Sequence, residues 1–353
     1  SLYISDVTAF THFDAQLLLT GHNPYTADSA FGRALLAFPG SSPTPIRSPL
    51  FGPTLDLPST DVIKPIEQRF LAGDSLTQGA FDPRTLHSYP ALAYLLYAPA
   101  LLLHLPNILI VNVLALLALY AWLVRVASPA ARHWTLVVAL AAVTIPFDSL
   151  LSDTEVICVA LLLLAWHYRD RRYLGPVLLG LACAFKQYPW YFAPFFLLDA
   201  AHEHGWREAG RRGLIALGAF LLPNLPFLIA SPQAWWTSLW LPLADPMYPM
   251  GIGIISLSHG HIVPYGGPPL YLALEVLAIG ACLWGAWRLR AQLGDAMLIL
   301  ALVPLYFAFR SPTNYFAFAP ILALYAANHV CSSRLVRLSN PQLDPDSEIL
   351  HAQ

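Results

Sequence analysis

Charged residues are scarce in this sequence. Asp, Glu, Lys and Arg make up 11% of the 353 residues and hydrophobic residues 57%, whereas soluble domains carry about 25% charged residues. The mean hydropathy is +0.55. This composition excludes an ordinary soluble domain and predicts an all-α, polytopic membrane helix bundle. The formal net charge of −2 lacks the basic excess of a nucleic-acid-binding protein, so we expect no nucleic-acid partner.

Cysteine is also rare, and its spacing matches no metal-binding pattern. The four residues lie in or beside apolar segments: Cys158, Cys183, Cys282 and Cys331. We interpret them as small hydrophobic side chains and expect neither a disulfide framework nor a cysteine metal site.

The sequence begins with neither an initiator Met nor a signal peptide, and we expect a transmembrane helix upstream of it. Residues 1–88 are expected to form an extracytoplasmic first loop with short interfacial helices, one of them at 60–72. The transmembrane bundle follows at 89–330, interrupted by an outer loop at 231–268. Residues 331–353 are expected to form a cytoplasmic tail.

The basic residues set the expected topology. Twelve of the 19 Lys and Arg residues lie in five short clusters, which the positive-inside rule places in the cytoplasm: Arg125 and Arg132; Arg169, Arg171 and Arg172; Arg207, Arg211 and Arg212; Arg288 and Arg290; Arg334 and Arg337. All five can share one side only if 89–104 does not cross the membrane and 174–200 enters and returns, breaking near Pro189. Five segments then open on the outer side: 1–88, 148–155, 186–190, 231–268 and 310–314.

Two acids of the first loop are the candidate catalytic residues. Asp6 and Asp14 are eight residues apart, just over two helical turns, so both can face the same side. A carboxylate at a membrane mouth is partly desolvated, which suits it to accept a proton from a hydroxyl group. The plainer interpretation is an amphipathic surface helix whose acids are solvated or interact with the helix dipole.

A possible second acidic loop contains Asp148, Asp153 and Glu155. These acids either cap the helix that follows or, together with the first-loop acids, bind a divalent cation such as Mg²⁺ or Mn²⁺. No ligand spacing requires a metal, so we assign no metal-binding residues.

Lys186 and Arg310 stand at the outer ends of membrane segments, against the inside bias. They either snorkel to the interface or bind a lipid phosphate, to which Arg offers a bidentate fork and Lys a point charge. Tyr89, Tyr188 and Asn314 lie in the same outer segments and are further candidates for substrate binding.

The outer loop 231–268 adds two candidate substrate-binding residues, His259 and His261, whose spacing only weakly suggests a metal pair. Its Trp and Tyr residues are typical of a membrane interface. Glu275 lies inside an apolar segment, where an acid is a functional candidate by default.

Three stretches carry a resemblance to a known family. They are SDVTAFTHFDAQLLLTGHNPY (5–25), HSYPALAYLLYAPALLL (87–103) and LGLACAFKQYPWYFAPFFLL (179–198). They resemble the first outer loop, the Tyr-Pro-rich segment and the Lys-x-x-Pro stretch of the GT-C superfamily of membrane glycosyltransferases. The closest likeness is to the family 87 type of polyprenol-phosphate mannosyltransferases.

The resemblance implies a mechanism. Asp6 would act as general base on an acceptor hydroxyl, which attacks the anomeric carbon of a lipid-phosphate sugar with inversion, while Lys186 and Arg310 steady the leaving phosphate. Asp14 could serve as the base instead or orient a sugar hydroxyl. The sequence departs from the family in two ways: Thr8 replaces the second acid of an Asp-x-Asp pattern, and the 26–88 insert is long and Pro-rich.

We therefore expect an integral-membrane glycosyltransferase that moves a hexose, by resemblance mannose, from a polyprenyl-phosphate carrier to a lipid or glycan acceptor. The expected location is a bacterial plasma membrane, with the site on the extracytoplasmic side. Transfer of a whole lipid-linked oligosaccharide is a second enzymatic possibility. The alternative is a transporter or flippase of a lipid-linked sugar carrier, a class that often has repeated halves, and no repeat is evident here.

Overall fold

The structure is a computed structural model, and it describes residues 3, 5–27, 30–38, 47–51, 55–56, 58–77, 88–142, 145, 154–241 and 247–328. The candidate acids Asp148 and Asp153, the arginines Arg334 and Arg337, and Cys331 lie outside these residues. Within them the chain is almost wholly helical, which confirms the expected all-α fold.

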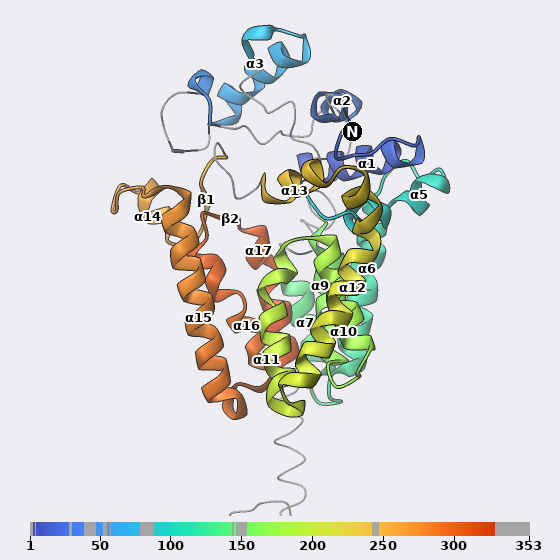
Figure 1. The fold of residues 1–353 in the computed structure, drawn as a ribbon, viewed down its shortest axis with the longest axis vertical. Helices are drawn as coiled ribbons and strands as arrows, with labels where there is room; N and C mark the ends of the chain where they lie inside the picture. The colour runs from blue at the N-terminus through green and yellow to red at the C-terminus, as the bar shows by residue number, and fades with distance from the viewer. Residues whose placement is uncertain are drawn as a thin grey trace, which may run out of the picture.

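Short helices gather at one end of the molecule, which we call the mouth end (Figure 1). They are α1 (Asp6–Leu19), α2 (Ala30–Ala37), η1 (Pro49–Phe51), α3 (Thr60–Leu71), η2 (Ser75–Thr77), α4 (Leu92–Leu95), α5 (Ala98–Leu102), α13 (Pro232–Trp240) and α14 (Ile255–His259). Helix α1 begins after Ser5, whose Oγ accepts a hydrogen bond from the amide of Val7 at 3.1 Å. Helix α3 matches the amphipathic helix expected at 60–72.

A second set of helices, rich in apolar residues, forms the bundle below the mouth end. They are α6 (Leu109–Val126), α7 (Arg132–Ala141), α9 (Glu155–His167), α10 (Leu174–Phe185), α11 (Ala193–His204), α12 (Trp206–Ala230) and α15 (Gly267–Leu293). The chain then continues through η5 (Gly294–Ala296), α16 (Met297–Leu300), η6 (Val303–Phe307), β2 (Arg310–Ser311) and α17 (Asn314–Ala317). Among the described residues, three helical stretches are long and apolar enough to cross a membrane: Leu109–Val126, Trp206–Ala230 and Gly267–Leu300.

The segment 174–200 forms a helical hairpin, as the arginine pattern predicts. Helix α10 ends at Phe185, the short 3-10 helix η3 (Tyr188–Tyr191) follows, and α11 begins at Ala193. The two halves run in opposite directions, because Lys186 at the end of α10 contacts the first residue of α9, whereas Asp199 near the end of α11 contacts Arg169 just past α9.

The segment 89–104 does not form one spanning helix. It breaks into α4 and α5, which have four and five residues. At about 1.5 Å per residue neither can cross a bilayer. Leu102 and Leu103 at the end of α5 are 64% and 75% exposed, as expected of a helix that lies at the membrane surface.

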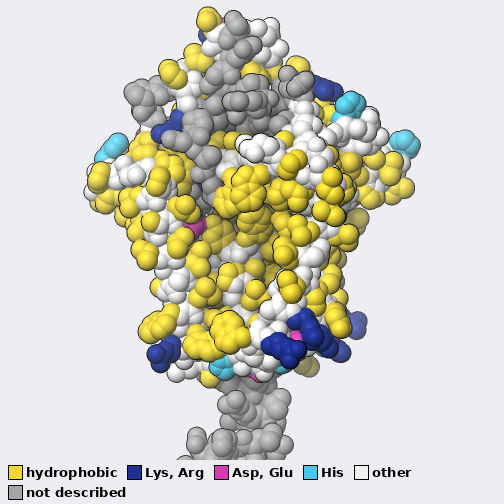
Figure 2. All heavy atoms as spheres, viewed as in Figure 1, with side chains coloured by type: hydrophobic (Ala, Val, Ile, Leu, Met, Phe, Trp, Pro, Cys, Tyr) yellow, Lys and Arg dark blue, Asp and Glu magenta, His cyan; other side chains and the backbone are white. Residues whose placement is uncertain are grey.

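Arginines gather at the end opposite the mouth end, at the bottom of Figure 2. There Arg169 and Arg290 share the carboxylate of Asp199, with nitrogen–oxygen distances of 3.2 and 2.8 Å. Arg169 also pairs with Asp295 at 2.9 Å. This ion-pair network ties α11 and α15 to the chain that follows α9. Between the arginine-rich end and the mouth end, the surface of the molecule is broadly apolar (Figure 2).

Close packing holds α10 against α12. A Cβ atom added to Gly180 would lie 2.1 Å from the main-chain oxygen of Ala216. Only glycine permits this approach, which fixes the position of the hairpin and therefore of Lys186 at its tip.

Candidate active site

A buried ion pair joins Lys186 to Glu155 at the mouth end of the bundle. Lys186 follows the last residue of α10, and Glu155 is the first residue of α9, so the antiparallel packing of these helices brings the two together. Their side chains are 3% and 2% exposed. Asn314, which begins α17, donates from Nδ2 to Glu155 Oε1 at 3.0 Å.

Tyr89 covers the lysine of this pair. Lys186 Nζ lies 4.7 Å from the centre of the Tyr89 ring, a cation–π contact. Gln187, the next residue, donates from Nε2 to the main-chain oxygens of Ser88 at 2.6 Å and of Leu239 at 3.1 Å. These bonds hold the segment that carries Tyr89 over the tip of the helical hairpin.

Arg310 lies near the same tyrosine. It stands in β2, which pairs in parallel with β1 (Met250–Gly251), and its Nη1 donates to the main-chain oxygen of Tyr248 at 3.0 Å. Burial lowers the pKa of the Arg310 guanidinium, and Tyr315, Tyr89 and Asp6 act in the opposite direction. Tyr89 is therefore a neighbour of both cations, and the charge of Asp6 reaches Arg310.

The two first-loop acids are both buried and occupy different surroundings. Asp6, the first residue of α1, is 9% exposed and acts on Arg310. Asp14 is 1% exposed and lies near Tyr25, whose pKa is raised mainly by burial and further by the Asp14 charge. The alternative of solvated surface acids is therefore wrong. The catalytic role of either residue stays a prediction.

Three buried polar atoms of this cluster have no hydrogen-bond partner among the described residues: Tyr188 Oη, Glu155 Oε2 and Asn314 Oδ1. Tyr188 is 3% exposed, and its ring centre lies 5.8 Å from that of Tyr315. The structure thus brings Lys186 and Asn314 into contact with Glu155, with Tyr89 against Lys186 and with Tyr188 within electrostatic reach of the Glu155 carboxylate.

The two histidines of the outer loop have other surroundings. His259 Nδ1 contacts Asp56 Oδ1 at 2.7 Å, which links α14 to the first loop. His261 is exposed and has a positive φ of 56°. No group of three or more His, Cys, Asp or Glu residues that could hold a metal ion occurs in the described part of the chain. Substrate binding by these histidines stays a prediction.

Two tyrosines of the site, Tyr315 and Tyr191, were not among the predicted residues. Tyr315, which faces both Tyr188 and Arg310, directly follows the candidate Asn314 and could have been found by its position in the same outer tip. The partner of the intramembrane acid Glu275 is the hydroxyl of Tyr191. Both tyrosines extend the polar cluster toward α15.

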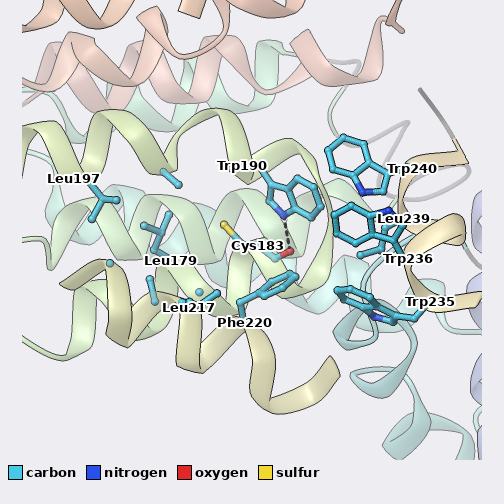
Figure 3. A pocket seen from close by; sticks show the side chains of 14 residues that line it. Leu179, Cys183, Trp190, Leu197, Leu217, Phe220, Trp235, Trp236, Leu239 and Trp240 are labelled. Atoms are coloured by element: carbon cyan, nitrogen blue, oxygen red, sulfur yellow. Dashed lines mark hydrogen bonds between the residues drawn. The ribbon is translucent and has the colours of Figure 1, made fainter. Parts of the chain in front are cut away.

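An apolar groove opens beside the hairpin tip (Figure 3). Its volume is about 360 Å³, and α10 to α13 supply its walls. Trp235, Trp236 and Trp240 gather at one end, while Leu197 marks the other. Trp190 donates from Nε1 to the main-chain oxygen of Cys183 at 3.0 Å, so little polar surface faces the groove.

Chemically, the cluster combines Lys186 against the Tyr89 ring, Arg310 within electrostatic reach of the same tyrosine and of the buried Asp6 carboxylate, and an adjoining apolar groove. Cations of this kind stabilise a phosphate, and a groove of this kind accepts a hydrocarbon chain.

Comparison with known proteins agrees with the sequence motifs. No curated protein and no solved structure matches this chain. A sequence model of one family, described as "Glycosyltransferase family 87", matches residues 87–312, a stretch that contains Tyr89, Glu155, Lys186 and Arg310. This match covers well over half of the chain, which therefore belongs to glycosyltransferase family 87.

Proposed function

We propose that this glycosyltransferase moves a hexose, mannose in the first instance, from a polyprenyl-phosphate carrier to a lipid or glycan acceptor with inversion. The observation that carries the proposal is the contact of Lys186 with Tyr89, together with Arg310, which lies within electrostatic reach of both Tyr89 and Asp6. Two cations and one base are the groups that a transfer from a lipid phosphate requires.

In the proposed reaction, the acceptor hydroxyl oxygen attacks the anomeric carbon while the Asp6 carboxylate takes the hydroxyl proton. The bond between the anomeric carbon and the phosphate oxygen breaks, and the lipid phosphate leaves with the electron pair. Lys186 and Arg310 stabilise the negative charge that develops on it. Because this is a single displacement from the opposite face, the configuration at the anomeric carbon is inverted.

The apolar groove supports a lipid-linked donor. It starts beside Gln187, the neighbour of Lys186, since Gln187 binds the main-chain oxygen of Leu239 in the groove wall. A carrier whose phosphate binds Lys186 could place its first prenyl units along the tryptophans. We propose that the mouth end faces the extracytoplasmic side of a bacterial plasma membrane and the arginine-rich end the cytoplasm.

The reaction as proposed needs no divalent cation at the second acidic loop. The charge of Glu155 is already balanced by Lys186. A cation bound to Glu155 Oε1 would compete with Lys186, which is the group that we assign to the donor phosphate.

The test measures sugar transfer by the full-length protein in membranes. Polyprenyl-phosphate mannose, glucose and arabinose serve as donors, and Asp6→Asn is compared with the parent and with Asp61→Asn. Asp61 is an exposed acid at the start of α3 and provides a matched control. We expect Asp6→Asn to lower the rate at least about 100-fold, as for loss of a general base, and Asp61→Asn to retain it.

Unchanged transfer in Asp6→Asn would remove Asp6 as the base and turn attention to Asp14. A parent that transfers no sugar from any donor, yet moves a labelled lipid-linked sugar across the bilayer, would favour the flippase alternative. Retained donor binding in Asp6→Asn separates a catalytic defect from a folding defect.

A further inference from the structure

Three buried polar atoms at and near Glu155 have no hydrogen-bond partner among the described residues, which is unusual inside a folded protein. Buried polar groups in proteins are nearly always hydrogen-bonded, because an unpaired one has lost its bonds to water without replacing them. Here three such atoms come from three elements: Glu155 from α9, Tyr188 from η3 and Asn314 from α17. The three residues are neighbours, because Asn314 binds Glu155 and the Glu155 charge reaches Tyr188, so segments far apart in the sequence present unsatisfied groups in one region.

The chemistry of these atoms specifies what they need. Glu155 Oε2 and Asn314 Oδ1 are acceptors only, and Tyr188 Oη can both donate and accept. The second polar atom of the Glu155 carboxylate and of the Asn314 amide is already bonded. Asn314 Nδ2 donates to Glu155 Oε1, and Lys186 binds the same oxygen. Glu155 Oε2 and Asn314 Oδ1 therefore need hydrogen-bond donors such as hydroxyl groups. A phosphate does not fit there, because its oxygens would face these two acceptors.

Aromatic rings flank the same point. Tyr188 packs against Phe192 and Tyr315, with ring centres 5.1 and 5.8 Å apart. Rings beside a set of carboxylate and amide oxygens are suited to a sugar, which has apolar C–H faces and hydroxyls at its rim. A lipid chain would leave all three polar atoms unsatisfied.

We propose that Glu155, Tyr188 and Asn314 form the subsite that binds the hydroxyl groups of the transferred sugar. This inference rests on the proposed transfer from a lipid phosphate and adds the residues that recognise the sugar itself. Glu155 then has two tasks, because one oxygen holds Lys186 in place while the other accepts a sugar hydroxyl. The sugar would lie next to the lysine that binds its phosphate.

The experiment compares Tyr188→Phe with the parent on the intact donor and on its monodeoxy analogues, each lacking one hydroxyl of the sugar that the parent transfers. Tyr188→Phe removes the hydroxyl and keeps the ring. A lost hydrogen bond of about 0.5–1.5 kcal/mol predicts a fall of about 2- to 13-fold in kcat/KM. For the one analogue without the partner hydroxyl, we expect Tyr188→Phe to cause no further loss.

Tyr173→Phe is the matched control, since Tyr173 is 61% exposed at the opposite end of the bundle. Asn314→Ala provides a second variant with the same logic, in case Tyr188→Phe does not fold. If the fall in kcat/KM caused by the variant and the fall caused by the missing hydroxyl multiply for every analogue, the side chain binds no sugar hydroxyl. That result would show that these groups bind water and would overturn the subsite alone. A parent that transfers no sugar from any donor would overturn the proposed function and the subsite together.

Discussion

The buried pair of Lys186 and Glu155 gives a quantitative prediction. Both side chains are almost fully buried, so removing one partner leaves the other charged and desolvated. Breaking such a pair costs about 3–5 kcal/mol, whereas replacing both members by apolar residues is often neutral. We expect Lys186→Met to destabilise the protein by about 3–5 kcal/mol, which shifts the unfolding equilibrium about 100- to 4,000-fold. The double variant Glu155→Leu/Lys186→Met should regain most of this loss.

The assay is reversible unfolding in micelles by SDS, followed by tryptophan fluorescence. Lys64→Met is the matched control, because Lys64 is exposed on α3 and its loss should cost little. Sugar transfer is measured in parallel, and it should be lost in both the single and the double variant, since both lack the lysine that we propose to bind the donor phosphate. A cost below about 1 kcal/mol for Lys186→Met, the level of an exposed pair, would refute the burial argument.

Three further predictions concern packing, ion pairs and pH. Gly180→Ala should destabilise the protein because its new Cβ would meet the backbone of Ala216, whereas Gly218→Ala, which meets nothing within 4 Å, should not; thermal unfolding distinguishes them. Asp199→Asn should cost about 1.5–3 kcal/mol for each hydrogen bond weakened between this acid and its two arginines, measured by the same SDS titration. Burial lowers the pKa of His12 to about 4, from 6.5, so the unfolded chain binds more protons between these values and stability falls as the pH drops from 6.5 toward 4. Replacing His12 with Gln should flatten the dependence of the unfolding midpoint on pH in this window, and an unchanged slope would contradict the assignment.

Much of the fold follows from the distribution of a few residue types. The scarcity of charge indicated a helix bundle, and the arginine clusters together with Pro189 indicated the hairpin of α10 and α11. These inferences succeeded because each depends on local composition and on one physical requirement, the cost of placing charge in a bilayer.

The site was less predictable, because its contacts join distant segments. Lys186 and Glu155 are 31 residues apart, and only the register of α9 against α10 makes them meet. The sequence placed Glu155 in one acidic loop with Asp148 and Asp153, and it suggested a lipid phosphate as the partner of Lys186. His259 likewise looked like one half of a histidine pair, yet its contact is with Asp56, 203 residues away. Pairings of this kind depend on tertiary packing and leave no spacing signal.

The short length of α10 explains why its terminal lysine needs a carboxylate. Twelve residues span about 18 Å, whereas the hydrocarbon core is about 30 Å thick. With the arginine-rich end of the bundle at one membrane face, Lys186 would lie on the order of 10 Å below the other face, beyond the easy reach of a snorkelling side chain. A lysine at that depth must be paired inside the protein, and Glu155 pairs it. The proposed donor phosphate would therefore have to reach Lys186 from the apolar groove, whose tryptophans would receive the hydrocarbon chain, while the acceptor would arrive from the mouth end where Asp6 lies.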